Sequence, residues 1–347
     1  MNPLIKPTML KPGDKVATIS LSWGAAGDIP HRYNYGKKQL QDVFGLEVVE
    51  TRNALKPAKW IYENPKARAE DLMEAFADSS IKAIITNIGG EDSVRTLPYI
   101  DFDIIRNNPK IFLGFSDSTV THFMCLKAGL TSFYGTSLFV GFAENCGMFP
   151  YQVADIKRTL FSAEPVGIVQ PNIDGWSSER LEWFDPSLTN VKRKLSPNEP
   201  WNFLQGADKK VTGRLIGGCI EALEFIKGTS IWPHMDEWND TILFLETSED
   251  KPDPTFVRWW LRNYASQGIL HKVNGLLFGR PYDSKFAAEY DAEIQRVLSE
   301  EGLTDLPVIT RMDFGHTSPT FTIPMGAMAE INGPDKTFSI LESGVVV

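Results

Sequence analysis

The pentapeptide Gly114-Phe115-Ser116-Asp117-Ser118 places a hydroxyl group where an apolar strand is expected to lead into a helix. In that context a tight, strained turn lifts a serine hydroxyl above the edge of a sheet, and small residues on either side leave room for the turn. Gly114 meets this requirement, and Ser118 is small, although glycine is more usual there. The helix N-terminus beyond the turn also directs backbone N–H groups towards a developing anion. Ser116 is therefore a candidate nucleophile; the alternative is a Ser/Asp N-cap in an ordinary strand–helix turn.

A serine nucleophile needs a base, and the chain contains five histidines. His316 follows a glycine just after an expected strand that begins at Val308, a position typical of an active-site edge. A surface-loop histidine is the alternative. The remaining histidines lie in an expected loop, in the helix after Ser116, or beside helix ends: His31, His122, His234 and His271. Elimination favours His316 as the base.

A third residue should be a carboxylate that orients the imidazole. Glu246 ends the apolar run Thr241–Leu245. A buried carboxylate without a partner is strongly unfavourable, so this position predicts an interaction for Glu246. The alternatives are a strand-end glutamate that points into solvent, and Glu249 as the orienting acid.

Two glycine pairs lie next to expected secondary-structure elements, Gly89-Gly90 at the end of a strand and Gly217-Gly218 before a helix. Gly89-Gly90 ends a strand, and its backbone can approach a substrate carbonyl because no side chain obstructs it. The Gly90 and Asp117 N–H groups are a hypothetical oxyanion hole, and a plain turn is the alternative. Gly217-Gly218-Cys219 precedes a helix whose N-terminus could lower the pKa of a thiol, so Cys219 is a rival nucleophile. No strong apolar strand is expected before it, and we expect Gly218 and Cys219 to line the substrate pocket instead.

The first half of the chain alternates strand-like and helix-like segments, which predicts an α/β fold with a parallel sheet covered on both faces. Its expected strands are Lys15–Ser22, Leu46–Glu50, Ile81–Ile88 and Ile111–Phe115, and its expected helices are Tyr33–Phe44, Pro65–Ala77 and Ser118–Ala128. A smaller mixed β/α domain should follow. Its expected strands are Thr241–Thr247, Val273–Phe278, Val308–Asp313, Phe321–Ile331 and Phe338–Val346, with helices at Cys219–Lys227, Thr255–Ser266 and Lys285–Glu300. We expect an N-terminal domain over 1–165, a linker and Trp-rich loop over 166–206, and a C-terminal domain over 207–347.

The composition is that of an ordinary globular protein, with 42% hydrophobic and 23% charged residues. The net charge of −9 and the absence of a Lys/Arg block disfavour nucleic acid as a partner. Three cysteines without metal-type spacing predict neither a metal site nor disulfides, as expected of a reducing compartment. No apolar stretch is long enough to span a bilayer, and the N-terminal residues do not resemble a signal peptide, so we expect a cytoplasmic protein without membrane contact.

Several motifs together resemble the LD-carboxypeptidase family of serine peptidases, which includes the microcin C self-immunity carboxypeptidases. The matching segments appear in the family's order: Asn87–Ser93, Gly114–Thr119, Gly213–Leu223, Ile242–Asp250 and Asp313–Pro319. The resemblance implies Ser116 as nucleophile, Glu246 as orienting acid and His316 as base, with the Gly90 and Asp117 amides as oxyanion donors. It also implies a flavodoxin-like N-terminal domain, a mixed C-terminal domain, a homodimer, and neither a metal nor another cofactor.

Two departures bear on the substrate. Cys219 stands where the murein-recycling members typically carry Asn, and the Trp-rich stretch Trp176–Trp201 is similar to the immunity branch. Trp176 or Trp183 could stack on a nucleobase, or these tryptophans could simply attach a long loop to the body. The expected substrate is a peptidyl or aminoacyl nucleotide. The alternatives are removal of the terminal D-Ala of a murein tetrapeptide and non-catalytic binding of a small molecule; an NAD-dependent oxidoreductase is disfavoured because no G-x-G-x-x-G follows the first strand.

Overall fold

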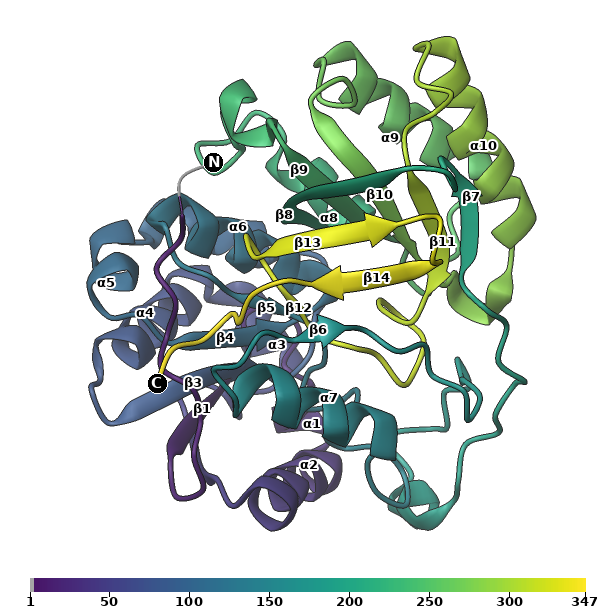
Figure 1. Ribbon diagram of the computed structural model, residues 1–347. Coiled ribbons are helices and arrows are strands. Elements are labelled where there is room, and N and C mark those ends of the chain that lie inside the picture. Colours follow the sequence, from purple (N-terminus) through teal and green to yellow (C-terminus); the bar gives the residue numbers. More distant parts are fainter. Residues whose placement is uncertain (1–2) are drawn as a thin grey trace.

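The computed structural model describes residues 3–347, which form two β-sheets (Figure 1). The first sheet has the order β12-β5-β4-β3-β1-β2, and strands β1 to β5 are parallel. This is the flavodoxin-like order 2-1-3-4-5, so the predicted N-terminal fold is confirmed. The strands are β1 (Lys15–Ile19), β2 (Glu47–Glu50), β3 (Ile81–Thr86), β4 (Ile111–Gly114), β5 (Phe133–Tyr134) and β12 (Ile323–Pro324).

Helices cover both faces of this sheet, as the strand–helix alternation predicts. On β3, Ile84 packs in a core with residues of α4 and α6, whereas its neighbour Ile85 packs on the opposite face with residues of α2 and α7. Successive side chains of a strand point to opposite faces, so one short apolar strand serves two helical layers. The helices are α1 (Ala25–Asp28), α2 (Pro30–Phe44), α3 (Ala58–Glu63), α4 (Pro65–Ala77), α5 (Phe102–Asn107), α6 (Thr119–Ala128) and α7 (Pro150–Leu160).

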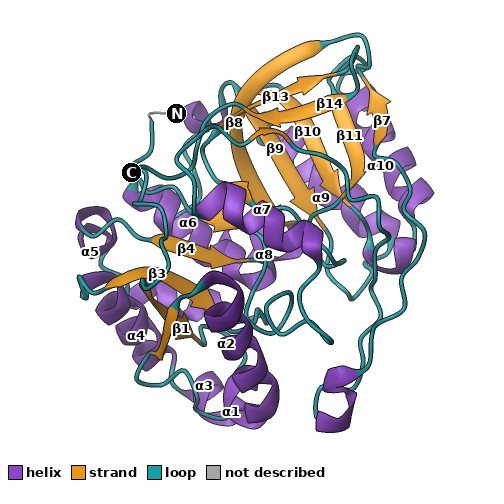
Figure 2. Ribbon diagram, turned by 60° about the horizontal axis from the view of Figure 1, so that its bottom comes forward, coloured by secondary structure: helices purple, strands orange, loops and turns teal. Residues whose placement is uncertain are grey.

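The second sheet has the order β6-β14-β13-β8-β9-β10-β11-β7, and the four adjacent strands β8 to β11 are parallel. Its strands are β6 (Gly167–Ile168), β7 (Asn202–Gln205), β8 (Lys210–Cys219), β9 (Thr241–Glu246), β10 (Val273–Gly279), β11 (Val308–Met312), β13 (Met328–Asn332) and β14 (Thr337–Ile340). Three helices accompany them: α8 (Ile220–Ile226), α9 (Pro254–Ser266) and α10 (Ala287–Glu300). The chain between β6 and β7 is mostly loop (Figure 2).

Two expectations for this half were wrong. No strong apolar strand was expected before Cys219, but the ten-residue strand β8 ends at this residue. Its glycines hid it in the sequence, yet they are required by close packing, since a Cβ atom at Gly217 would lie 1.7 Å from the carbonyl oxygen of Phe244 on β9. The expected single strand Phe321–Ile331 is also divided. The chain crosses between the sheets at Gly326 (φ 80°), so that β12 pairs with β5 and β13 pairs with β8.

The division into 1–165, 166–206 and 207–347 stays a proposal, and β12 is a C-terminal contribution to the first sheet. Within residues 3–347, no helix combines the length and apolar character needed to cross a membrane.

Candidate active site

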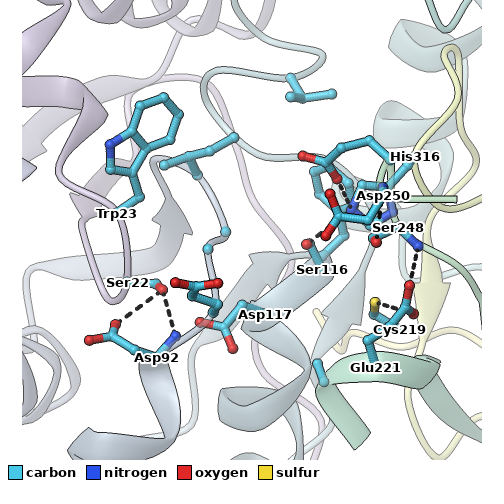
Figure 3. A pocket seen from close by; sticks show the side chains of 18 of the residues that line it. Ser22, Trp23, Asp92, Ser116, Asp117, Cys219, Glu221, Ser248, Asp250 and His316 are labelled. Carbon is cyan, nitrogen blue, oxygen red and sulfur yellow. Dashed lines mark hydrogen bonds and ion pairs between the residues drawn. The ribbon is translucent and has the colours of Figure 1, made fainter. Parts of the chain in front are cut away.

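A cavity of about 700 Å³ lies where the carboxyl ends of both parallel sheets meet. Much of its lining comes from the carboxyl end of β8 and from the segments that follow β1, β3, β4, β8 and β9. In open parallel sheets, ligands bind beyond the carboxyl ends of the strands at the point where the strand order reverses, here between β1 and β3. Figure 3 shows Ser116 and His316 on one side of this cavity and Trp23 across from them.

Ser116 occupies a strained turn between β4 and α6. Its φ of 61° lies in the left-handed region, which a non-glycine residue adopts at a cost of about 1–3 kcal/mol. Small neighbours make the turn possible, because a Cβ atom at Gly114 would lie 2.5 Å from the Thr86 hydroxyl. A Cβ atom at Gly89 would likewise lie 2.9 Å from Cβ of Ser116. This is the local geometry expected of a nucleophile elbow.

His316 bridges Ser116 and Glu246. Its Nε2 atom lies 3.0 Å from Oγ of Ser116, and its Nδ1 atom lies 2.7 Å from Oε2 of Glu246. Gly315 lets the loop pass directly over the carboxylate, since its φ is 100° and a Cβ atom there would lie 2.7 Å from Oε2 of Glu246. The structure therefore brings the three residues that the sequence suggested into one hydrogen-bonded chain.

The two candidate acids contact different nitrogens of His316. Glu246 is fully buried at the end of β9, and its second oxygen, Oε1, accepts a hydrogen bond of 2.5 Å from the hydroxyl of Tyr134. Glu249 instead places Oε2 3.2 Å from Nε2, on the side of the ring that faces Ser116. An orienting acid must bond to the nitrogen remote from the nucleophile, and only Glu246 has that geometry.

The charges around His316 favour its protonated form. Burial alone would lower the pKa of its imidazole, but the charge and hydrogen bond of Glu246, with Glu249 and Glu221 adding to them, raise that pKa to about 9. Opposite charges nearby stabilise imidazolium, the form that a base adopts after it has taken the serine proton. The site is thus preorganised for the protonated state of the base.

The two expected oxyanion donors lie beside Ser116 in the lining of the cavity. Gly90 has a φ of 145°, and within residues 3–347 its N–H donates to no recorded acceptor. The Asp117 side chain is buried, and its Oδ2 accepts a 2.9 Å hydrogen bond from the Ser93 N–H, which ties the segment after β3 to the elbow. The segment that contains Gly90 is therefore held against the turn that contains Ser116 and Asp117.

Cys219 lines the cavity as expected, but its environment is unsuited to a thiolate. Burial and the neighbouring Glu221 and Glu246 carboxylates raise the pKa of the Cys219 thiol well above its ordinary value. A nucleophilic cysteine requires the opposite environment. His122 is also excluded as a base in contact with Ser116, because it is fully buried and its Nε2 lies 2.9 Å from the carbonyl of Gly114; burial lowers the pKa of its ring to about 4.

Of the tryptophans expected to bind substrate, only Trp183 lines the cavity. Its ring stacks with Trp23 at 6.3 Å between centroids, and the guanidinium of Arg180 lies 4.1 Å above it. Trp176 is buried under Arg280, with 5.1 Å between guanidinium and ring, and it does not line the cavity. The expectation for Trp176 is therefore corrected: it packs the loop against the body.

The expectation for Gly218 also needs correction. It lies behind the cavity wall, where a Cβ atom would come within 2.6 Å of Thr119. A glycine is required at this position because β8 packs closely against the start of α6. Cys219, one residue later, is the first residue of this segment to reach the cavity.

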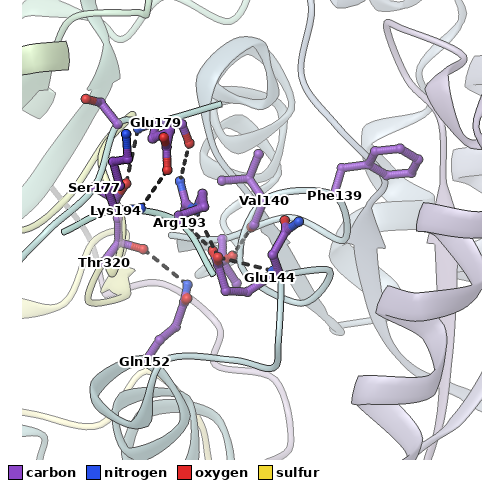
Figure 4. Close-up of polar contacts among 12 residues, drawn as sticks. Phe139, Val140, Glu144, Gln152, Ser177, Glu179, Arg193, Lys194 and Thr320 are labelled. Carbon is purple, nitrogen blue, oxygen red and sulfur yellow. Dashed lines mark hydrogen bonds and ion pairs between the residues drawn. The ribbon is translucent and has the colours of Figure 1, made fainter. Parts of the chain in front are cut away.

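The loop that carries Trp183 is attached to both halves of the molecule (Figure 4). Arg193 pairs with the buried carboxylate of Glu144 on the N-terminal side, its Nε donating across 2.8 Å. Within the loop itself, the Lys194 N–H donates to Glu179 at 2.6 Å. Ser177 exchanges two backbone hydrogen bonds with Ser318, just beyond His316. The loop that carries Trp183 and the segment that carries His316 are thus connected through the backbone.

Four residues of the site were missed in the sequence, and one of them, Arg180, lies in the same irregular loop as Trp183. Trp23 follows the first strand at the switch point, and that position was an available signal. Glu221, a cavity carboxylate on α8, and Tyr134, at the end of the two-residue strand β5, gave no signal, since only the folded structure brings them to Ser116 and Glu246.

Comparisons with known proteins find similarity in both halves of the chain. Residues 16–135 match the LD-carboxypeptidase N-terminal domain, and residues 212–331 match the LD-carboxypeptidase C-terminal domain. The microcin C7 self-immunity protein MccF of Escherichia coli is 29% identical over 334 residues, which cover 95% of this chain and 94% of that protein.

Solved structures share the whole architecture. A MccF-like protein from Streptococcus pneumoniae in complex with AMP has a TM-score of 0.85 and 31% identity, over 94% of this chain and 98% of that one. MccF in complex with aspartyl sulfamoyl adenosine has a TM-score of 0.84 and 26% identity, over 99% of this chain and 100% of that one. Both domains, in order and over nearly the full length, therefore show that the chain belongs to the LD-carboxypeptidase family and is a serine-type carboxypeptidase.

Proposed function

We propose that this carboxypeptidase hydrolyses the C-terminal amide-type bond of a peptidyl or aminoacyl nucleotide, and thereby confers immunity to a toxin of the microcin C type. The observation that carries the proposal is the position of Trp183 and Arg180 in the same cavity as Ser116. An aromatic face offers stacking to a nucleobase, and a guanidinium offers paired hydrogen bonds to a phosphate or sulfamate group. The relatives named above support this assignment, because their ligands are AMP and aspartyl sulfamoyl adenosine.

In the proposed mechanism, His316 accepts the proton of Ser116 as the serine oxygen attacks the carbonyl carbon of the scissile bond. Glu246 holds the imidazole through Nδ1 and stabilises the imidazolium. The oxyanion is received by the N–H groups of Gly90 and Asp117. The imidazolium then protonates the leaving nitrogen, and water hydrolyses the acyl-enzyme.

The test compares two substrates by mass spectrometry: aspartyl or glutamyl sulfamoyl adenosine, and a murein tetrapeptide. The expected result is cleavage of the nucleotide conjugate, with kcat lowered by several powers of ten in Ser116→Ala and binding largely kept. Loss of D-Ala from the tetrapeptide alone would reassign the protein to murein recycling. Binding without turnover in both proteins would instead identify a binding protein, and efficient cleavage of casein would contradict a carboxypeptidase that needs an exposed C-terminal group.

The homodimer expected from the family resemblance is part of the same proposal. Sedimentation velocity on the purified chain measures it, and a monomer across the micromolar range would contradict it.

A further inference from the structure

Tyr134 lies beneath the catalytic residues and has no part in the mechanism above. It ends β5, next to the strand that leads to Ser116, and it is fully buried. Its ring packs against Phe244 on β9 and against His122 on α6, with 5.5 Å between centroids in each case. These contacts fix the position of the hydroxyl between the two sheets.

The Tyr134 hydroxyl closes a ring of hydrogen bonds that begins and ends at Ser116. The Ser116 N–H donates to the Tyr134 oxygen at 3.1 Å, and the Tyr134 O–H donates to Oε1 of Glu246 at 2.5 Å. The other Glu246 oxygen lies 2.7 Å from Nδ1 of His316, whose Nε2 lies 3.0 Å from Oγ of Ser116. The directions of the two hydrogen bonds of Tyr134 are fixed, because a backbone N–H can only donate and an ionised carboxylate can only accept.

We propose that Tyr134 is a positioning residue of the reaction: its hydroxyl locks the backbone of the nucleophile to the acid that orients the base. The proposal rests on the catalytic roles assigned above to Ser116, His316 and Glu246. Burial and the charge of Glu246 raise the pKa of the Tyr134 hydroxyl well above its ordinary value, so it keeps the proton that it donates.

Two consequences follow from this arrangement. Ser116 has a left-handed φ of 61°, and the Tyr134 oxygen is the acceptor that holds its N–H in that conformation. The carboxylate of Glu246 is held at both oxygens, so it cannot rotate away from Nδ1. Without the hydroxyl, the Ser116 amide loses its acceptor and Glu246 loses one of its two donors, while the packing of the ring is kept.

The test is Tyr134→Phe, with Tyr264→Phe as the matched control. Tyr264 is also fully buried, but its hydroxyl has no hydrogen-bond partner in residues 3–347, so its removal should leave the site unchanged. For Tyr134→Phe we expect kcat to fall about 10- to 100-fold, the loss of one or two hydrogen bonds that matter in the transition state, with KM within about twofold. Thermal unfolding of both variants checks that they fold.

A second readout separates this proposal from the choice of substrate. A fluorophosphonate labels an activated serine: the Ser116 oxygen forms a bond to phosphorus, fluoride leaves, and His316 takes the serine proton. We expect slower labelling of Tyr134→Phe, and an acidic limb of its pH profile displaced to higher pH. The displacement follows because a carboxylate with one fewer donor stabilises the imidazolium more strongly.

Each outcome of this labelling experiment decides the proposal. If wild type and Tyr134→Phe were labelled at equal rates, with the acidic limbs of their pH profiles at the same pH, the role of Tyr134 would be overturned and the proposed function would stay intact. An equal loss in Tyr264→Phe would also overturn it, since that result would be structural. If the wild-type protein were not labelled at Ser116, the nucleophile assignment and the role of Tyr134 would both be wrong.

Discussion

Glu249 and Ser116 contact the same nitrogen of His316. Oε2 of Glu249 lies 3.2 Å from Nε2, and Oγ of Ser116 lies 3.0 Å from it. The leaving nitrogen of a substrate must also approach Nε2 to receive its proton. In the proposed mechanism Glu249 and the leaving nitrogen therefore compete for the same position, and the other oxygen of Glu249 lies 3.9 Å from Arg180.

Replacing Glu249 should make the base more effective near neutral pH. Burial alone would lower the pKa of His316, but Glu246 first and Glu249 after it raise that pKa to about 9, so at pH 7 most of the free enzyme carries imidazolium, which cannot accept the serine proton. The Glu249→Gln change removes a negative charge, lowers this pKa and increases the neutral fraction. We expect kcat/KM at pH 7 to rise about three- to tenfold, the effect of about half to one pKa unit.

The measurement is kcat/KM from pH 5.5 to 10. The wild-type profile should rise about tenfold per pH unit up to its limb near 9, and the limb of Glu249→Gln should lie at lower pH. Glu91→Gln is the control, because Glu91 lines the same cavity, whereas the ion pairs of His316 within residues 3–347 are those with Glu246 and Glu249. If the kcat/KM profiles of wild type and Glu249→Gln had their limbs at the same pH, Glu249 would have no effect on the pKa of the base.

Adding a single methyl group at Gly315 should impair catalysis more than folding. An added Cβ atom would lie 2.7 Å from Oε2 of Glu246, and the left-handed φ of 100° disfavours alanine. Both effects displace the carboxylate from Nδ1 of His316. We expect Gly315→Ala to lower kcat at least about 100-fold and the free energy of unfolding by about 1–3 kcal/mol.

Steady-state kinetics and denaturant unfolding measure the two quantities for Gly315→Ala. Gly129→Ala is a suitable control for backbone strain alone, since its φ is 82° and a Cβ atom there meets nothing within 4 Å. An unchanged kcat in Gly315→Ala would show that Glu246 tolerates displacement.

The proximity of the three candidate residues could be predicted from the sequence because each lies at the end of a strand or shortly after it. Ser116, Glu246 and His316 lie at or just beyond the ends of β4, β9 and β11, and parallel strands bring their carboxyl ends to one edge. Glu246 also stood out as an acid at the end of an apolar run. Periodicity and strand ends therefore indicated the fold class and the three residues that the structure brings together.

Contacts across the two sheets could not be predicted in this way. Tyr134 reaches Glu246 through a two-residue strand, and such a strand has no periodicity to detect. The strand β8 was not expected because the contact that requires a glycine at 217, with Phe244 of β9, involves a distant segment of the chain. Trp176 and Trp183 looked equivalent, and the two differ only in which face of the loop packs against the body.

The two tryptophans should respond differently to replacement. Trp183→Ala removes a ring that lines the cavity and leaves Arg180 without its stacking partner, so KM for an aminoacyl sulfamoyl adenosine should rise about 5- to 100-fold, the worth of stacking at 1–3 kcal/mol. Trp176→Ala empties a buried site and should lower the free energy of unfolding by about 3–5 kcal/mol.

Isothermal titration of AMP and denaturant unfolding, each on both variants, measure this difference. The prediction fails if Trp176→Ala weakens the binding of AMP while Trp183→Ala leaves it unchanged. Such a result would place the nucleotide-binding site beside Trp176, on the buried side of the loop.

Cys219 should be dispensable for the chemistry. Its thiol donates to Oε2 of Glu221 at 3.3 Å, and burial beside Glu221 and Glu246 raises its pKa, so very little thiolate exists at neutral pH. Cys219→Ser keeps a donor of similar size and should retain kcat within about threefold, whereas Ser116→Ala should lose several powers of ten. Iodoacetamide should leave the wild-type activity intact, with labelling confined to the exposed Cys146. Rapid inactivation by iodoacetamide that is absent in Cys219→Ser, together with a large loss of kcat in that variant, would make the thiol the nucleophile and remove Ser116 from that role.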